Sequence, residues 1–243
     1  MTERGMIFNG EMVRAIIDGR KTQTRRIVKG TDGAVKFCKE WDINGEEIFV
    51  VLGEKDHTGM NPVLGAISCP FGGIGDRIWV RETWSDVNLE GIPAVAYRAD
   101  GDVYSLMDDE SFLDEDGAFN YDEPRVTKYH FAAWYSDLIG GIEGDWRPSI
   151  HMPRWASRIL LEITEVRVER LREISQADAE AEGVGKLKKG FWKNYQPGWT
   201  EFQLTARGSF ATLWKSIYGD ESWYADPWVW VIEFKRIEEV RGA

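Results

Sequence analysis

The sequence has few of the residues that mark disulfide-rich, metal-binding or membrane-spanning proteins. It contains only two cysteines, Cys38 and Cys69, and their separation matches neither a disulfide framework nor a zinc-binding spacing. Its three histidines, His57, His130 and His151, lie far apart along the chain and match no metal-ligand pattern. No stretch approaches the roughly 20 consecutive apolar residues that a membrane span needs. We therefore expect no metal site and no membrane partner.

Two further absences bear on cofactors and on the cellular compartment. No glycine-rich phosphate loop, nucleophile elbow or histidine-based triad is visible, and so no cofactor is expected. Residues 1–5 lack the basic-then-apolar order of a secretory signal, which predicts a cytoplasmic protein.

Charge is distributed unevenly along the chain. The net charge of −11 argues against a surface built to hold duplex nucleic acid through its phosphates. Residues 20–30 nevertheless contain five cations and no acid, and residues 146–159 contain three cations and no acid. Residues 108–123 contain eight acids and no base, which is typical of a solvated loop. The two basic segments are therefore the candidate ligand-binding regions.

Hydrophobic periodicity predicts a globular α+β chain. A short helix is expected after Asn9 and ends at Gly19, and a strand follows over residues 22–28. Residues 34–52 have the pattern of a hairpin around Asn44-Gly45, a dipeptide that favours a type I′ turn. A glycine- and proline-rich loop is expected next, then strands at 77–84, 159–171 and 228–237, and helices at 175–183 and 210–217.

Several of these pieces occur together in one protein family. The pieces are Gly-Arg-Lys-Thr-Gln-Thr-Arg at 19–25, the strand led by Gly75-Asp76, the helix that ends with Ala-Glu-Gly at 181–183, the helix at 210–217 and the strand at 228–234. Together they resemble an ASCH domain, most of all the longer form found in bacteriophages and prophages. This resemblance implies one domain over 1–243 with a PUA-like fold, a small β-barrel with flanking helices, and large insertions at about 30–75, 86–150 and 184–209.

The resemblance also implies a reaction and three catalytic residues. Small ASCH proteins remove the acyl group from acetylcytidine, and their motif corresponds here to Lys21, Thr24 and Glu182. Amide hydrolysis by these groups needs the Thr24 hydroxyl as nucleophile, Lys21 with a lowered pKa as base, and Glu182 to orient the ammonium. Residues three apart face opposite sides of an ideal strand, so the spacing permits convergence without requiring it. The alternative is a surface lysine and threonine, with Glu182 paired to Lys186 or Lys188.

Further residues are predicted to contact the ligand, and they are Arg20, Arg26, Glu82, Arg154, Trp155 and Arg158. Glu82 is expected to approach Lys21 and to add a second carboxylate to the pocket. Arg154, Trp155 and Arg158 mix cations with an aromatic ring, a combination that clamps a phosphate and stacks a base. The alternative for these three is structural: the arginines pair with acids and Trp155 fills the core.

Three functions stay open at this point. The first is a nucleoside or nucleotide pocket that hydrolyses an acyl amide on a modified cytidine. The second is a non-catalytic module that binds single-stranded RNA or a modified base. The third is a phage accessory protein that binds a host factor through residues 108–123. Convergence of Lys21, Thr24 and Glu182 would favour catalysis, because a module that only binds needs no activated hydroxyl.

Overall fold

A computed structural model describes residues 1–196, 198 and 201–237. It divides into two compact units. Unit 1 comprises Met1–Arg4, Ala15–Arg77 and Glu162–Lys235, and unit 2 comprises Gly5–Arg14, Ile78–Leu161 and the residues from Arg236 onward. The α+β class predicted from the sequence is confirmed. The prediction of one domain over 1–243 stays a prediction.

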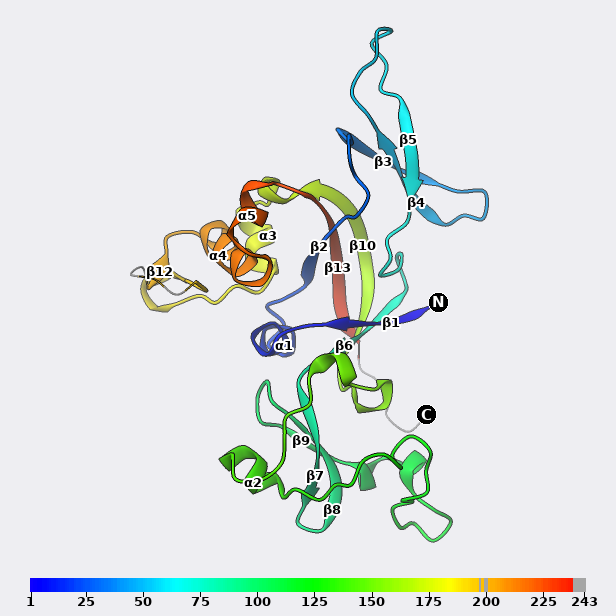
Figure 1. Cartoon of the computed structure of the whole chain (residues 1–243), viewed down its shortest axis with the longest axis vertical. Helices are drawn as coiled ribbons and strands as arrows, with labels where there is room; N and C mark the ends of the chain where they lie inside the picture. Colours follow the sequence, from blue (N-terminus) through cyan, green and yellow to red (C-terminus); the bar gives the residue numbers. More distant parts are fainter. Residues whose placement is uncertain (197, 199–200, 238–243) are drawn as a thin grey trace. The chain divides into compact units, whose positions relative to one another are not determined.

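The helices and strands follow one another as Figure 1 labels them. The strands are β1 (Glu3–Ile7), β2 (Gln23–Ile27), β3 (Lys36–Trp41), β4 (Glu47–Leu52), β5 (Val63–Ile67), β6 (Arg77–Arg81), β7 (Trp84–Leu89), β8 (Ile92–Tyr97), β9 (Val103–Ser105), β10 (Leu160–Arg170), β11 (Trp192–Lys193), β12 (Phe202–Gln203) and β13 (Trp228–Ile237). The α-helices are α1 (Gly10–Ile17), α2 (Tyr135–Gly140), α3 (Gln176–Ala181), α4 (Ala206–Tyr218) and α5 (Asp220–Tyr224). No helix among the described residues has both the length and the apolar character required to cross a membrane.

The largest sheet has the strand order β1-β6-β10-β13-β2. Its β13–β2 pair, within unit 1, is antiparallel, and in its register Thr24 lies opposite Ile232 and Arg26 opposite Trp230. The short helix before β2 forms as expected: the Asn9 side chain accepts a hydrogen bond from the Met12 amide at 2.9 Å. This pairing positions the basic segment, because it makes β2 an ordered strand with two distinct faces.

The hairpin predicted at 34–52 is present as β3 and β4, and a third strand follows. Its turn differs from the expected type I′, because Asp42 rather than the dipeptide organises it: the Asp42 carboxylate accepts from the Asn44 and Glu46 amides at 2.9 and 2.8 Å. Only Gly45 has a positive φ there, whereas a type I′ turn requires two. The segment predicted to be entirely loop supplies β5, which completes a three-stranded sheet in the order β3-β4-β5.

Unit 2 is built around an aromatic core rather than around a barrel. Trp84, Tyr97 and Phe112 lie in one buried cluster beside the three-stranded sheet β7-β8-β9. Phe112 and Phe119, which belong to the acidic segment 108–123, are 1% and 8% exposed in that cluster. The interpretation of this segment as a simple solvated loop is therefore wrong, because its aromatic residues supply part of the core.

Candidate functional site

The motif around Lys21 interlocks with the end of helix α3. Helix α3 begins with the predicted capping box, in which the Ser175 hydroxyl accepts from the Asp178 amide at 3.0 Å. At its other end, Thr22 donates its amide to Ala181 at 2.8 Å. Gly183 follows with φ +83°, and a Cβ there would lie 2.7 Å from the Lys21 Cβ. A glycine is therefore required at this position by both its backbone conformation and its neighbour.

Lys21 is sealed inside this junction. Its ammonium donates to the Gln23 carbonyl at 2.8 Å, to the Glu182 carbonyl at 3.0 Å and to the Glu182 Oε2 at 2.7 Å. The side chains of Lys21 and Glu182 are 0% and 2% exposed. Burial lowers the pKa of Lys21, which the Glu182 carboxylate opposes and the nearby Arg26 and Arg25 reinforce. All three ammonium protons are thus used within the protein.

Glu182 also accepts a second cation, and this contact starts a larger network. Arg25 Nη1 lies 3.0 Å from Glu182 Oε1, and its Nη2 lies 3.3 Å from Glu169 and 3.8 Å from Asp178. Arg167 then links Glu169, Asp178 and Glu233. We call this set the charge cluster, and its members are Lys21, Arg25, Arg167, Glu169, Asp178, Glu182 and Glu233. Three cations face four carboxylates, so the cluster neutralises most of its own charge.

Thr24 does not join the charge cluster. Lys21, Gln23 and Arg25 all reach towards α3, and alternation along β2 therefore directs Thr24 to the opposite face of the sheet. There its hydroxyl accepts a hydrogen bond from Arg26 Nη1 at 2.8 Å. No hydrogen bond among the described residues connects Thr24 with Lys21 or Glu182. The structure thus brings together two of the three predicted catalytic residues and separates the third.

Arg20 and Arg26, both predicted to bind ligand, are engaged locally. Arg20 donates to the Gly183 carbonyl at 3.0 Å and pairs with Asp18 at 2.9 Å, while its side chain stays 45% exposed. Arg26 is half-buried and donates to the Arg25 carbonyl at 3.0 Å as well as to Thr24. Arg20 therefore remains the more accessible of the two cations.

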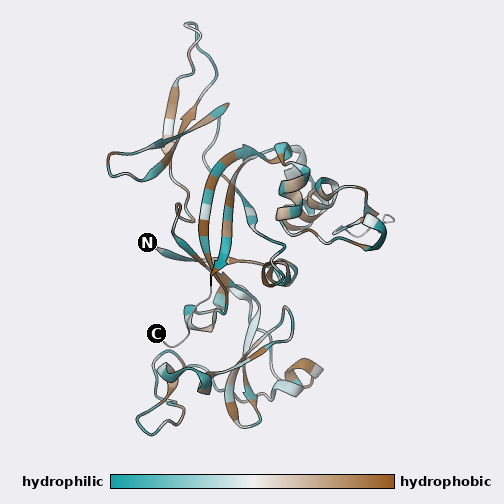
Figure 2. Cartoon of the chain, turned by 180° about the vertical axis from the view of Figure 1, so that it is seen from behind, coloured by the Kyte–Doolittle hydropathy of each residue, from teal (hydrophilic) through white to brown (hydrophobic). Residues whose placement is uncertain are grey.

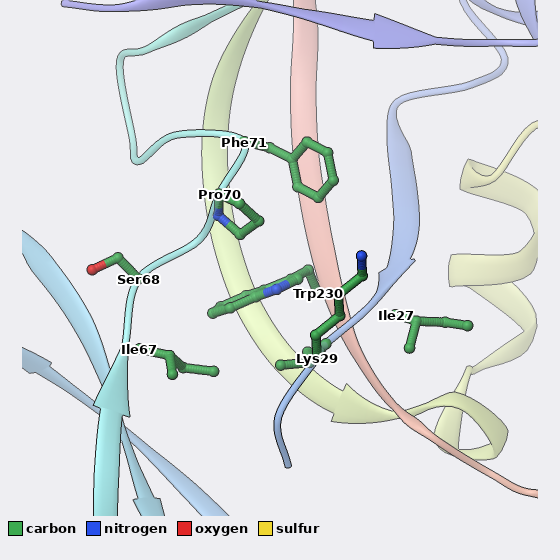
Figure 3. A pocket seen from close by; sticks show the side chains of 8 residues that line it. Ile27, Lys29, Ile67, Ser68, Pro70, Phe71 and Trp230 are labelled. Atoms are coloured by element: carbon green, nitrogen blue, oxygen red, sulfur yellow. The ribbon is translucent and has the colours of Figure 1, made fainter.

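The Thr24 face of the sheet borders a pocket of about 450 Å³, drawn in Figure 3. Its lining consists of Ile27, Val28, Lys29, Ile67, Ser68, Pro70, Phe71 and Trp230. Trp230 lies opposite Arg26 in the β2–β13 register, so it shares the sheet face of Thr24. Lys29 is the only charged side chain among the described residues that line the pocket, and it is exposed. The pocket combines aromatic and apolar walls with one cation at its rim.

Sequence reasoning did not identify this pocket. Trp230 was interpreted as core or barrel lining because it alternates with Trp228 along a strand. The complementary wall comes from the loop after β5, where Pro70 and Phe71 stand next to each other. An aromatic residue beside a proline in a glycine-rich loop was the one available signal, and its partner lay about 160 residues away.

Glu82 and Arg158 form a second buried ion cluster, inside unit 2. Arg158 binds both Glu82 oxygens, at 2.9 and 3.0 Å, and also pairs with Asp100 at 2.9 Å and Asp102 at 3.1 Å. Its guanidinium lies 4.1 Å from the centre of the Tyr97 ring. Burial raises the pKa of Glu82, which is 1% exposed, although Arg158 opposes the shift. The structural alternative for Arg158 is confirmed, and the placement of Glu82 near Lys21 stays a prediction.

The remaining predicted residues, Arg154 and Trp155, lie in one 3₁₀ turn of unit 2, Arg154–Ala156. The Trp155 ring packs edge-on against Tyr129 at 5.4 Å and Phe112 at 5.6 Å. Trp155 is partly buried against the unit 2 core, as its structural alternative predicted. It therefore offers less ring surface for stacking a base than the sequence pattern indicated.

Comparison of the chain with protein-family models, with curated proteins and with solved structures finds no match. Within the described part of the chain, no group of three or more histidine, cysteine or acidic side chains is arranged to hold a metal ion. The functional argument therefore depends on the geometry of the charge cluster and of the Trp230 pocket.

Proposed function

We propose that unit 1 is an ASCH-type, PUA-like module that binds a nucleoside or nucleotide without hydrolysing it. The observation that carries the proposal is the pocket of about 450 Å³ beside Trp230. Its volume falls within the roughly 300–1,000 Å³ typical of small-molecule sites. Aromatic walls favour a flat base, and Lys29 at the rim suits a phosphate or a neighbouring nucleotide of single-stranded RNA.

The interlocked motif supports the ASCH assignment of this unit. The pieces that resemble the family, 19–25 and the Ala-Glu-Gly at the end of α3, contact each other through the Lys21–Glu182 pair and the close approach of Gly183. A motif pair that is distant in sequence and adjacent in space has a structural reason to occur together. The closed PUA-like barrel implied by the resemblance is part of the proposal.

Binding is favoured over catalysis because the predicted catalytic groups are separated and occupied. A general base must lie within hydrogen-bond reach of the proton that it removes. Thr24 instead faces away from Lys21 and accepts from Arg26. Lys21 has no exposed surface and spends its three protons on Gln23 and Glu182.

An amidohydrolase is the second candidate, and one observation favours it. Burial lowers the pKa of Lys21 beside Glu182, as a lysine base requires. For this chemistry, Lys21 must leave its two carbonyl partners and meet the Thr24 hydroxyl around the edge of β2.

The test is calorimetric titration with cytidine, cytidine monophosphate and acetylcytidine, together with chromatographic detection of acyl release. The binding proposal predicts micromolar to millimolar affinity and no release of acetate. Lys29→Ala is expected to weaken the monophosphate about fivefold and to leave cytidine unchanged, because only the phosphate loses a charged partner. Lys55→Ala, an exposed lysine outside the pocket, is the matched control. Acetate release by the wild type would establish the second candidate instead.

A further inference from the structure

The sheet β3-β4-β5 in unit 1 has one packed face and one open face. Phe37 meets Trp228 at 4.9 Å and Phe49 meets Trp230 at 5.0 Å, so these side chains define the packed face. Alternation along the strands places the other set on the opposite face. We call this set the outer face, and its members are Lys36, Cys38, Glu40, Ile48, Val50, Leu52, Val63 and Ala66.

The outer face is apolar and only partly buried. Six of its eight residues are apolar, and Figure 2 shows hydrophobic colour along these strands. Val63 is 68% exposed, Ala66 is exposed, and Val50 in the centre is half-buried. The two charged members, Lys36 and Glu40, make no hydrogen bond or ion pair in the described part of the chain. A cluster of apolar side chains left in this state is typical of an interaction surface.

The charges on this face have an internal symmetry. Its cross-strand rows are Lys36–Leu52–Val63, Cys38–Val50–Ala66 and Glu40–Ile48. A half turn about the middle row exchanges the first row with the third. A second copy placed by that half turn sets Lys36 over the partner's Glu40, and Glu40 over the partner's Lys36. Leu52 meets the partner's Ile48 between them.

We propose that the outer face packs against the outer face of a second copy of this chain, with the strands β3 antiparallel. Sheets stacked face to face bury their apolar side chains at about 10 Å separation, and a two-fold axis requires a self-complementary patch. The Lys36 and Glu40 pattern meets that requirement, since each copy supplies the partner charge that the other lacks. A partner of strong net charge of either sign would leave one of these residues opposed by a like charge.

The size of the face determines how strong this dimer is. Three strands about 4.8 Å apart and five or six residues long at about 3.3 Å each cover on the order of 300 Å². Two such faces bury less than the roughly 1,000 Å² expected for a stable interface. The dimer is therefore weak and forms with rising protein concentration.

Sedimentation velocity of the full chain over a wide concentration range tests this proposal. We expect a monomer–dimer equilibrium, about tenfold weaker in Lys36→Glu and in Glu40→Lys, because each change creates two like-charge contacts by symmetry. The double variant K36E/E40K restores opposite charges and recovers the wild-type affinity. Lys55→Glu and Glu54→Lys make the same charge changes on exposed residues outside the face and leave the equilibrium unchanged.

The native cysteine on the middle row supplies a second readout. The half turn brings Cys38 next to the partner's Cys38, and a short bismaleimide should therefore join two chains in wild type and not in Cys38→Ser. Val50→Asp, at the centre of the face, should abolish both the crosslink and the dimer while circular dichroism stays unchanged. A monomer at all concentrations overturns the proposal, as does a double variant that is no better than its single parents. Slow alkylation of Cys38 at low concentration overturns it too, since the same chain then covers the face.

Discussion

The two units each contain a buried ion cluster, and the two clusters have opposite designs. In unit 1 the carboxylate of Glu182 is shared by two cations, Lys21 and Arg25, whereas in unit 2 the guanidinium of Arg158 is shared by several acids. A buried lysine can lose its proton near neutral pH, but an arginine stays charged. The comparison separates a cluster with potential chemistry from one that only connects elements.

The largest expected effect comes from removing the shared carboxylate in unit 1. Glu182→Gln leaves Lys21 and Arg25 buried with the carboxylate charge gone, and breaking a buried ion pair in this way costs about 3–5 kcal/mol. Urea unfolding should show that loss in the free energy of unfolding. Glu180→Gln, an exposed change in the same helix, is the control and should alter stability by less than about 0.5 kcal/mol. Equal effects of the two changes would contradict the assignment of Glu182 as the centre of the cluster.

Removing the shared cation in unit 2 should have a smaller effect. Arg158→Ala leaves Glu82 buried and unpaired, but Asp100 and Asp102 are 29% and 61% exposed and stay hydrated. We expect a loss of about 2–3 kcal/mol in thermal unfolding. Arg158→Lys should recover only part of it, because an ammonium cannot bind both Glu82 oxygens in parallel. Full recovery by lysine would show that charge alone matters at this position, and Arg98→Ala serves as the exposed control.

The pH dependence of unit 2 isolates Glu82. Because burial raises its pKa, the folded state keeps this proton at pH values where the unfolded state has lost it. The unfolded state then binds fewer protons, and stability falls as the pH rises from about 4.5 through the folded pKa. Comparing the free energy of unfolding of wild type and Glu82→Gln from pH 4.5 to 7 measures this contribution. The wild type should lose stability relative to the variant with rising pH, and the reverse slope would contradict the raised pKa.

The smallest expected effect distinguishes binding from catalysis in unit 1. Thr24→Val removes the hydroxyl and keeps the shape of the side chain. Since Thr24 lies outside the pocket lining, ligand affinity should change by less than about twofold, roughly the effect of a surface substitution. Titration with cytidine monophosphate measures it, with Thr22→Val as an exposed control in the same motif. If Thr24→Val instead abolished acetate release from acetylcytidine, the hydrolase candidate would stand.

Local sequence signals predicted much of the fold. Asn9 caps the first helix, Ser175 and Asp178 form the capping box of α3, and apolar alternation located β10 and β13. These features depend on residues within a few positions of one another, and short-range rules describe them well. The resemblance to a known motif also drew attention to Lys21 and Glu182, which the structure joins at 2.7 Å.

Other features were beyond those rules because they depend on which strand faces mate. Thr24 was grouped with Lys21 by motif position, yet strand alternation turns it to the other face, beside Arg26. Arg158 looked like a ligand-binding cation in sequence, and its role was decided by Glu82, 76 residues earlier. Contacts at such separations follow from sheet order and loop packing, which no local pattern encodes.

By itself, the sequence determined the α+β class, the positions of most regular elements and the concentration of positive charge before and within β2, since propensity and periodicity act over short distances. Only the tertiary structure decided how that charge is used. Folding buried Lys21 against Glu182, directed Thr24 away from both, and assembled a pocket from Trp230, Phe71 and Lys29. The physical reason is that burial and pairing are properties of neighbours in space, and the same basic residues change from ligand contacts to structural ion pairs when acids reach them first.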